Sequence, residues 1–327
     1  MAHNLATTNG KVATMFFGEV PWHRLGTRLE NPATASEAIT AAGLDYEVEL
    51  KQLFTGDGTF VPHRKGVVRS DNGEVLGAVG NTYVPVQNRQ AFGFLDAVVA
   101  DGSLRYHTAG ALGKGERIWL LAKLPSQIRV KNSDDLVDKF LLLSNAHDGS
   151  SALRVYFTPI RVVCQNTLNL ADNRSTGQGI SILHKGNLHT KIREAQRVLG
   201  LAEEFYDEAE GIIDILASHH PSSVQVEAFF QSVIPDPIGA DNARARKVRD
   251  RLTCLFETGI GQDMPEIKGT SWAAYNAVTE FVDHHRPTRS TDPLERASRR
   301  LDSSWFGSGA RLKAKAWNLA FDMALSV

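Results

Sequence analysis

The first candidate group of chemically useful side chains in the sequence is a set of cations and amides between residues 154 and 193. Eight of them are predicted to contact a nucleic acid: Arg154, Arg161, Gln165, Asn169, Arg174, Lys185, Lys191 and Arg193. Arginine and lysine bind phosphate oxygens, and amide side chains add hydrogen bonds that tolerate many base sequences. The alternative is a solvated helix face that has no ligand, because charges on helices usually have that role.

A thiol lies within the same stretch. Cys164 follows His147 and Asp148 in the chain, and a thiolate nucleophile needs a base within hydrogen-bond reach. The favoured interpretation is instead a core cysteine, because cysteine is among the most frequently buried residue types. No catalytic residue is assigned, and Cys164 is expected to act in packing.

Two histidine pairs, at 219–220 and 284–285, are the candidates for metal binding. Adjacent residues on a helix point in different directions, and neither pair has the spacing of a zinc motif. The glycine-rich segment 110–115 lacks the Lys-Ser/Thr pair of a phosphate-binding loop. No metal and no cofactor is therefore assigned.

A second basic group surrounds two tryptophans near the end of the sequence. Its members are Arg289, Arg296, Arg299, Arg300, Arg311, Lys313 and Lys315. Basic residues interleaved with aromatic residues can bind single strands by charge and stacking. The favoured interpretation is a pair of amphipathic helices that pack Trp305 and Trp317 inward.

The elements that position these residues begin with an apolar run at Phe140–Ser144, which is typical of a buried strand. A turn follows at Asn145–Ser151, then a second strand at Ala152–Phe157. Thr158-Pro159 is predicted to start a helix with one amide-rich face, since proline is tolerated in a first helical turn. Arg161 would then oppose the helix dipole, which favours an external anion or a carboxylate as its partner.

The remaining pattern predicts an α+β fold with a largely antiparallel sheet backed by helices, followed by a helical C-terminal part. Strands are expected at about 46–52, 59–69, 74–80, 104–110, 117–124 and 180–184, with a hairpin turn at Ser70–Gly73. Helices are expected at about 35–42, 88–99, 187–217, 224–233, 242–257, 271–284, 294–301 and 311–325. A domain boundary near residue 218 divides the chain into an α+β core (1–218) and a helical domain (219–327).

Four segments carry a family resemblance: NAHDGSSALRVYFTPIRVVCQNTLNLA, GEVPWHRLG, GERIWLLAKLP and GTSWAAYNAVTEFVDH. They resemble the phage/plasmid-like protein family, catalogued as domain of unknown function 932, over nearly the whole chain. The resemblance implies a setting on phages, prophages and plasmids and brings no established activity. The expected sheet–hairpin–helix plan is also similar to phage single-strand annealing proteins, which implies a homo-oligomer.

Composition limits the possible functions. The net charge is −1, so any anion site must come from local clustering of cations, and two cysteines suit a reducing cytoplasm. No apolar run approaches the ~20 residues of a membrane span, and no signal peptide is evident, so a cytoplasmic protein of a bacterial host cell is expected.

The hypothesis that follows is a protein that binds or anneals single-stranded DNA in recombination or replication. One alternative is a metal-dependent enzyme acting on nucleic acid or a nucleotide, which would need carboxylates converging near Arg154 and Arg161. The other is a structural or host-interaction oligomer.

Overall fold

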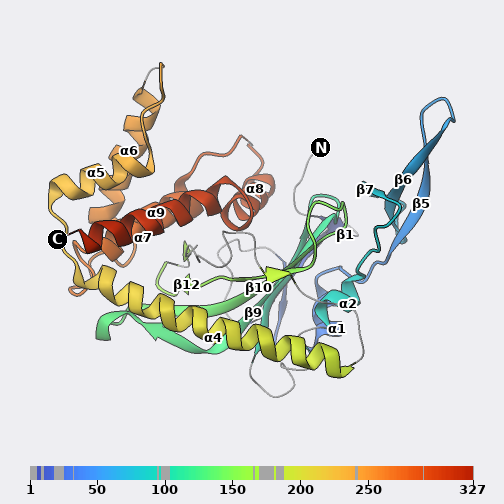
Figure 1. The fold of residues 1–327 in the computed structure, drawn as a ribbon, viewed down its shortest axis with the longest axis horizontal. Helices are drawn as coiled ribbons and strands as arrows, with labels where there is room; N and C mark the ends of the chain where they lie inside the picture. Colours follow the sequence, from blue (N-terminus) through green and yellow to red (C-terminus); the bar gives the residue numbers. More distant parts are fainter. Residues whose placement is uncertain are drawn as a thin grey trace.

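The computed structural model describes residues 6–8, 11–17, 26–31, 33–93, 96, 104–164, 166–168, 180–181, 188–239, 242–289 and 291–326. A curled sheet lies at the centre, a group of helices lies at one end, and a narrow three-stranded sheet projects at the other (Figure 1). This is an α+β fold, as the sequence predicts.

The central sheet has the strand order β13-β12-β10-β9-β8-β3-β4, with β11 also paired to β10 and β14 paired to β11. Its strands are β3 (Thr14–Phe17), β4 (Thr27–Leu29), β8 (Arg105–Leu112), β9 (Arg117–Arg129), β10 (Leu136–Ala146), β11 (Arg154–Phe157), β12 (Ile160–Arg161), β13 (Asn166–Thr167) and β14 (Ile180–Ser181). β3 and β4 are parallel, and the other pairs are antiparallel. The expectation of a largely antiparallel sheet is confirmed.

The sheet is buried on both faces, which explains the continuous apolar run in β10. Alternate residues of a strand point to opposite faces, so Leu141 and Leu143 join one hydrophobic cluster while Phe140 and Leu142 join another. The long helix α4 (Leu188–Ser218) crosses the first face (Figure 1), and its Tyr206 hydroxyl donates to the Phe140 carbonyl at 2.6 Å. Leu301 and Trp305 of helix α8 (Pro293–Trp305) pack against the second face.

The projecting sheet consists of β5 (Val48–Phe54), β6 (Phe60–Arg69) and β7 (Val75–Gly80), in that order. The predicted hairpin turn between β6 and β7 is confirmed, with Gly73 at a positive φ of 74°. Two short helices, α1 (Ala35–Ala41) and α2 (Asn88–Phe92), flank this sheet in the chain, and β1 (Thr7–Thr8) pairs with β2 (Lys11–Val12). Thr34 caps α1 through a capping box with Glu37.

The helical part comprises α5 (Ser223–Val233), α6 (Ala243–Thr258), α7 (Ser271–Glu280), the π-helix η2 (Phe281–His285), α8 and α9 (Ser308–Leu325). Every residue of α7 is buried, because α4, α6 and α9 pack around it. Sheet residues and α7 residues belong to the same hydrophobic cluster. The division into two domains stays a prediction, although α4 ends at Ser218.

The helix predicted after Thr158-Pro159 is wrong. The chain there forms β12, a turn at 162–164, and β13, which pairs back onto β12. The Val162 amide donates to the Leu136 carbonyl at 2.8 Å, so β10 holds this segment in extended form. The β-branched side chains of Ile160 in β12 and Thr167 in β13 also favour extended backbone over helix.

Among the described residues, no helix is both long enough and apolar enough to cross a membrane.

Candidate anion-binding site

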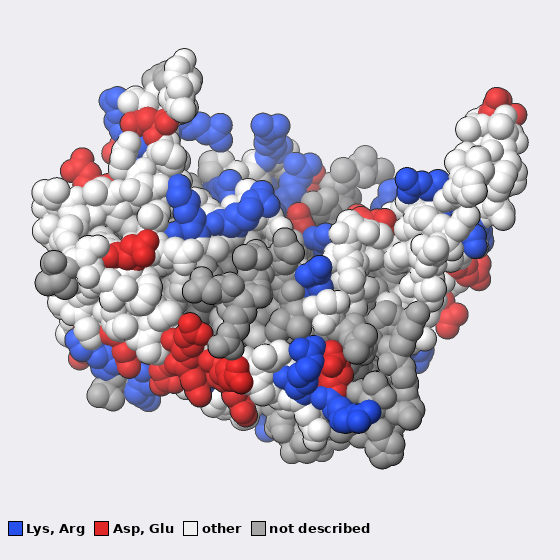
Figure 2. All heavy atoms as spheres, in the orientation of Figure 1, with Lys and Arg blue, Asp and Glu red and all other residues white. Residues whose placement is uncertain are grey.

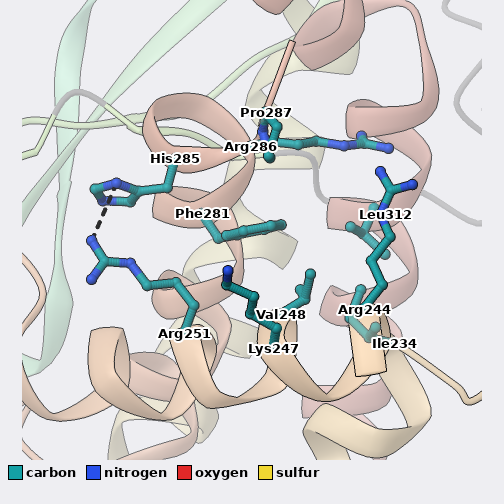
Figure 3. A pocket seen from close by; sticks show the side chains of 10 residues that line it. All are labelled: Ile234, Arg244, Lys247, Val248, Arg251, Phe281, His285, Arg286, Pro287 and Leu312. Atoms are coloured by element: carbon teal, nitrogen blue, oxygen red, sulfur yellow. Dashed lines mark hydrogen bonds between the residues drawn. The ribbon is translucent and has the colours of Figure 1, made fainter. Parts of the chain in front are cut away.

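A pocket of about 560 Å³ opens between α6, η2 and α9 in the helical part. Its lining residues are Ile234, Arg244, Lys247, Val248, Arg251, Phe281, His285, Arg286, Pro287 and Leu312 (Figure 3). Four of these carry a permanent positive charge, and none of these described lining residues is acidic. The volume lies within the ~300–1,000 Å³ range of small-molecule sites in proteins.

Helix α6 supplies one wall of the pocket because its sequence repeats at helical spacing. Arg244, Lys247, Val248 and Arg251 lie at intervals of three and four residues, so they share one face of the helix. Leu252 and Leu255 are buried on the core side. The burial of one face therefore turns a row of cations toward the pocket.

The other wall comes from the turn where α7 becomes the π-helix η2. Phe281 begins this turn, His285 ends it, and Arg286 follows directly. π-helical turns are rare in proteins, and those that occur are often found at functional sites. Figure 3 shows the Phe281 ring between the side chains of η2 and those of α6.

Buried polar contacts fix the position of η2. The Asp283 carboxylate accepts hydrogen bonds from Lys313 Nζ at 3.0 Å, from the Thr167 amide at 2.7 Å and from Ser304 Oγ at 2.6 Å. These partners come from α9, β13 and α8, so three elements hold one carboxylate. Loss of Lys313 would leave the Asp283 charge without its ionic partner in the interior, which is costly.

The floor of the pocket is apolar. Ile234, Val248, Phe281 and Leu312 supply the apolar part of the lining, and Figure 3 shows Phe281 among the cations. Val248 and Leu312 are half-buried, whereas Phe281 is 6% exposed. The pocket thus combines an apolar floor with a cationic rim.

The cations of the rim lie close enough to destabilise one another's charged forms. Burial lowers the pKa of Arg286, and the nearby charges of Arg244 and Arg311 lower it further. The Arg286 Nη1 atom is buried and has no hydrogen-bond partner among the described residues. A buried donor without a partner is costly, and an anion in the pocket would relieve that cost.

The opposite end of the rim is partly neutralised. Arg251 Nη2 lies 3.3 Å from His285 Nδ1, and His285 Nε2 lies 3.4 Å from Glu280 Oε1. The uncompensated charge is therefore greatest at the end formed by Arg244 and Arg286, with Arg311 beside it.

The wider surface divides into regions of opposite charge. Figure 2 shows many Lys and Arg side chains over the upper side of the helical part and in the hollow beside it, with a few Asp and Glu among them, and the largest group of Asp and Glu below. The second half of α4 carries six carboxylates, Glu203, Glu204, Asp207, Glu208, Glu210 and Asp214, and no lysine or arginine. A polyanion is accordingly attracted to the α6 side and repelled by α4.

The predicted nucleic-acid residues do not assemble into one surface. Arg161 is fully buried: its Nε lies 2.8 Å from both Asp135 oxygens, and its guanidinium donates to the carbonyls of Ile260 and Gly261. Its assignment to ligand binding is corrected here, because the carboxylate partner is internal and no external anion reaches the side chain. The guanidinium instead joins β12 to the loop after α6.

Arg154 lies on β11, half-buried, and Arg193 is exposed on α4. The backbone of Lys191 lies in α4, but its side chain falls outside the described residues. Gln165, Asn169, Arg174 and Lys185 also fall outside them. The nucleic-acid role of these residues and of Arg154 and Arg193 stays a prediction.

The expectation for Cys164 is confirmed: it is 5% exposed, and burial raises the pKa of its thiol to about 11. His147 is elsewhere in the core, where its Nε2 lies 2.8 Å from Asn88 Oδ1. The described residues include no group of three His, Cys, Asp or Glu side chains placed to hold a metal ion.

The prediction that the tryptophans of the C-terminal basic group pack inward is also confirmed. Trp305 packs edge-on against Trp119 at 5.0 Å between ring centroids, and Trp317 packs against Tyr275 at 5.2 Å. Lys313 is buried in the Asp283 contact described above, while Arg311 lies beside the pocket.

The pocket residues on α6 were not predicted from the sequence, although their basic character is visible in it. Five of the eight residues from Arg244 to Arg251 are basic, the densest such run of the helical part. The run lies outside the four segments on which the family resemblance was based. Its helical spacing indicates a site only once the core face of α6 is known.

Comparison with known families gives one match. A family model described as domain of unknown function (DUF932) matches residues 75–305, more than two thirds of the chain. The chain belongs to this family. The matched region contains α6, η2 and all of the pocket lining except Leu312. No curated protein and no solved structure matches the chain.

Proposed function

We propose that this member of the DUF932 family binds single-stranded nucleic acid, with the cationic rim of the α6–η2–α9 pocket as its phosphate-binding site. The observation that carries the proposal is the rim itself: Arg244, Lys247 and Arg286 meet there, with no acidic residue among the described lining residues. Guanidinium and ammonium groups are the usual partners of phosphate in nucleic-acid sites.

The charge pattern supports a polyanion more than a small neutral ligand. The overall charge is −1, yet cations concentrate over the helical part and carboxylates concentrate on α4. Such separation guides an anionic chain to one side of a protein without a high net charge. Phages, prophages and plasmids are the setting that the sequence resemblance implies, and recombination or replication of their DNA is the role proposed.

The test is fluorescence anisotropy with a labelled oligothymidylate of about 20 nucleotides, titrated between about 50 and 200 mM salt. The double variant Arg244→Glu/Lys247→Glu reverses two exposed charges of the rim. We expect at least a tenfold loss of affinity, together with a salt slope that flattens by about 1.4 for two lost phosphate contacts.

The matched control is Arg64→Glu/Lys65→Glu on β6, which changes the net charge equally at the opposite end of the molecule (Figure 1). Its affinity should stay within about threefold of the parent. A third variant, Arg193→Glu, tests the surface predicted from the sequence. Equal losses in the rim and control variants, or no binding by the parent chain, would refute the proposal.

A further inference from the structure

The apolar floor of the pocket is not needed for a site that only contacts phosphates. Val248, Phe281 and Leu312 present a surface next to the cations that water solvates poorly. A bare phosphate would leave this surface exposed to water. The floor therefore indicates a ligand with an apolar or aromatic part next to its negative charge.

Resting on the proposed function, we infer that the pocket holds one unpaired nucleotide of the bound strand, with its base on the floor and its phosphate at the rim. The base faces Phe281, Val248 and Leu312, and the phosphate lies at the end formed by Arg244 and Arg286. The phosphate then lies beside the Arg286 guanidinium, whose Nη1 has no hydrogen-bond partner among the described residues.

The size and shape of the site fit a single nucleotide. The pocket volume of about 560 Å³ accommodates one base with its sugar and phosphate but no base pair together with its flanking backbones. A base in a duplex would have to leave its stack to enter, which costs a few kcal/mol. The pocket consequently selects single strands over duplexes.

The test compares three labelled ligands of equal length and backbone charge per strand: oligothymidylate, an abasic strand of tetrahydrofuran residues, and a blunt duplex. The parent chain is used unaltered, so the comparison does not depend on a variant that folds. We expect oligothymidylate to bind at least fivefold more tightly than the abasic strand, the lower end of base-stacking effects. It should also bind more tightly than the duplex.

A variant locates the effect. Val248→Ser/Leu312→Ser makes two of the four apolar floor residues polar and keeps every cation. Both side chains are half-buried, so the fold should tolerate the change. This variant should bind oligothymidylate and the abasic strand within about twofold of each other. Thermal unfolding of the variant verifies that it is folded.

The outcomes separate the two ideas. If the parent binds base-containing and abasic strands equally, or binds the duplex as tightly as the single strand, the base-pocket inference is overturned while phosphate binding stands. If the floor variant keeps the full preference for bases, the pocket is not where the base lies. If no nucleic acid binds at all, the proposed function fails and the inference fails with it.

Discussion

Replacement of Arg161 by alanine should strongly destabilise the protein, because the side chain neutralises a carboxylate in the core. Arg161 and Asp135 are both fully buried, and Asp135 Oδ2 also accepts from Trp272 Nε1 at 2.9 Å. The Ala variant leaves Asp135 with one neutral donor and leaves the carbonyls of Ile260 and Gly261 without theirs. Removal of one partner of a buried ion pair costs about 3–5 kcal/mol, a large fraction of the ~5–15 kcal/mol that stabilises a typical domain.

The assay is urea unfolding followed by circular dichroism and tryptophan fluorescence. With a slope near ~3 kcal/mol/M, the midpoint of Arg161→Ala should fall by about 1 M or more. Arg161→Lys restores a charge but not the planar fork of donors, so it should recover only part of the loss. Arg154→Ala, on a half-buried residue of the neighbouring strand, is the control and should cost less than ~1 kcal/mol.

If the midpoints of Arg161→Ala and Arg154→Ala agree within error, the reasoning from the buried pair is refuted. The same holds if Arg161→Ala keeps its stability and loses only nucleic-acid binding. Arg161 would then act at the surface after all, as the helical reading of its segment implied.

Two further predictions concern groups that the core keeps neutral. The pKa of about 11 predicts that the buried Cys164 thiol resists a thiol reagent near pH 7.5 in the folded protein, whereas the exposed Cys254 thiol reacts. The reagent should therefore detect one fast-reacting thiol in native protein and two in urea-unfolded protein. Equal reaction rates for both thiols in the native state would contradict this prediction. Burial, together with the nearby charge of Lys123, lowers the pKa of His107 to about 4. Between pH 6.5 and pH 4 the unfolded state therefore binds a proton at His107 that the folded state does not bind. The free energy of unfolding consequently falls as the pH falls through this range. His107→Phe should remove about 2 kcal/mol of the stability lost between about pH 7 and pH 5 in urea titrations, and an unchanged loss would exclude His107 as a source.

The pocket and the core use the same elements. The carboxylate of Asp283, held by Lys313 and Thr167, fixes η2, and η2 in turn places Phe281 and Arg286 in the pocket wall. The proposed binding groups therefore lie on α6 and η2 and at the residue that directly follows η2. Little of the binding energy should be spent on ordering the site.

Most helices and strands were determined by local sequence. Capping residues and turns set α1 and the β6–β7 hairpin, and regular apolar stripes set α4 and α9. The apolar run of β10 was enough to predict burial of a strand, and the apolar neighbours of Cys164 were enough to predict burial of its thiol. In each case the deciding interactions lie within a few residues along the chain.

Tertiary structure alone decided the segment after Thr158-Pro159 and the role of its arginine. The segment has helix-compatible spacing, but pairing with β10 makes it a hairpin. Arg161 finds its partner Asp135 26 residues away and its backbone acceptors about 100 residues away. No local sequence pattern encodes a contact at that separation. Arg161 was therefore predicted to lie at the surface, whereas the fold places it in the interior.

The candidate site shows the same division. The sequence predicted helices at about 242–257 and 271–284, which contain the α6 cations and Phe281. Only the packing of α6 and α9 around α7 decided which face of α6 turns inward and that Arg244 and Arg286, more than 40 residues apart, repel one another across one pocket. A pocket is made by surfaces that meet, and residues distant in the chain meet only because burial of the apolar faces fixes how the helices pack.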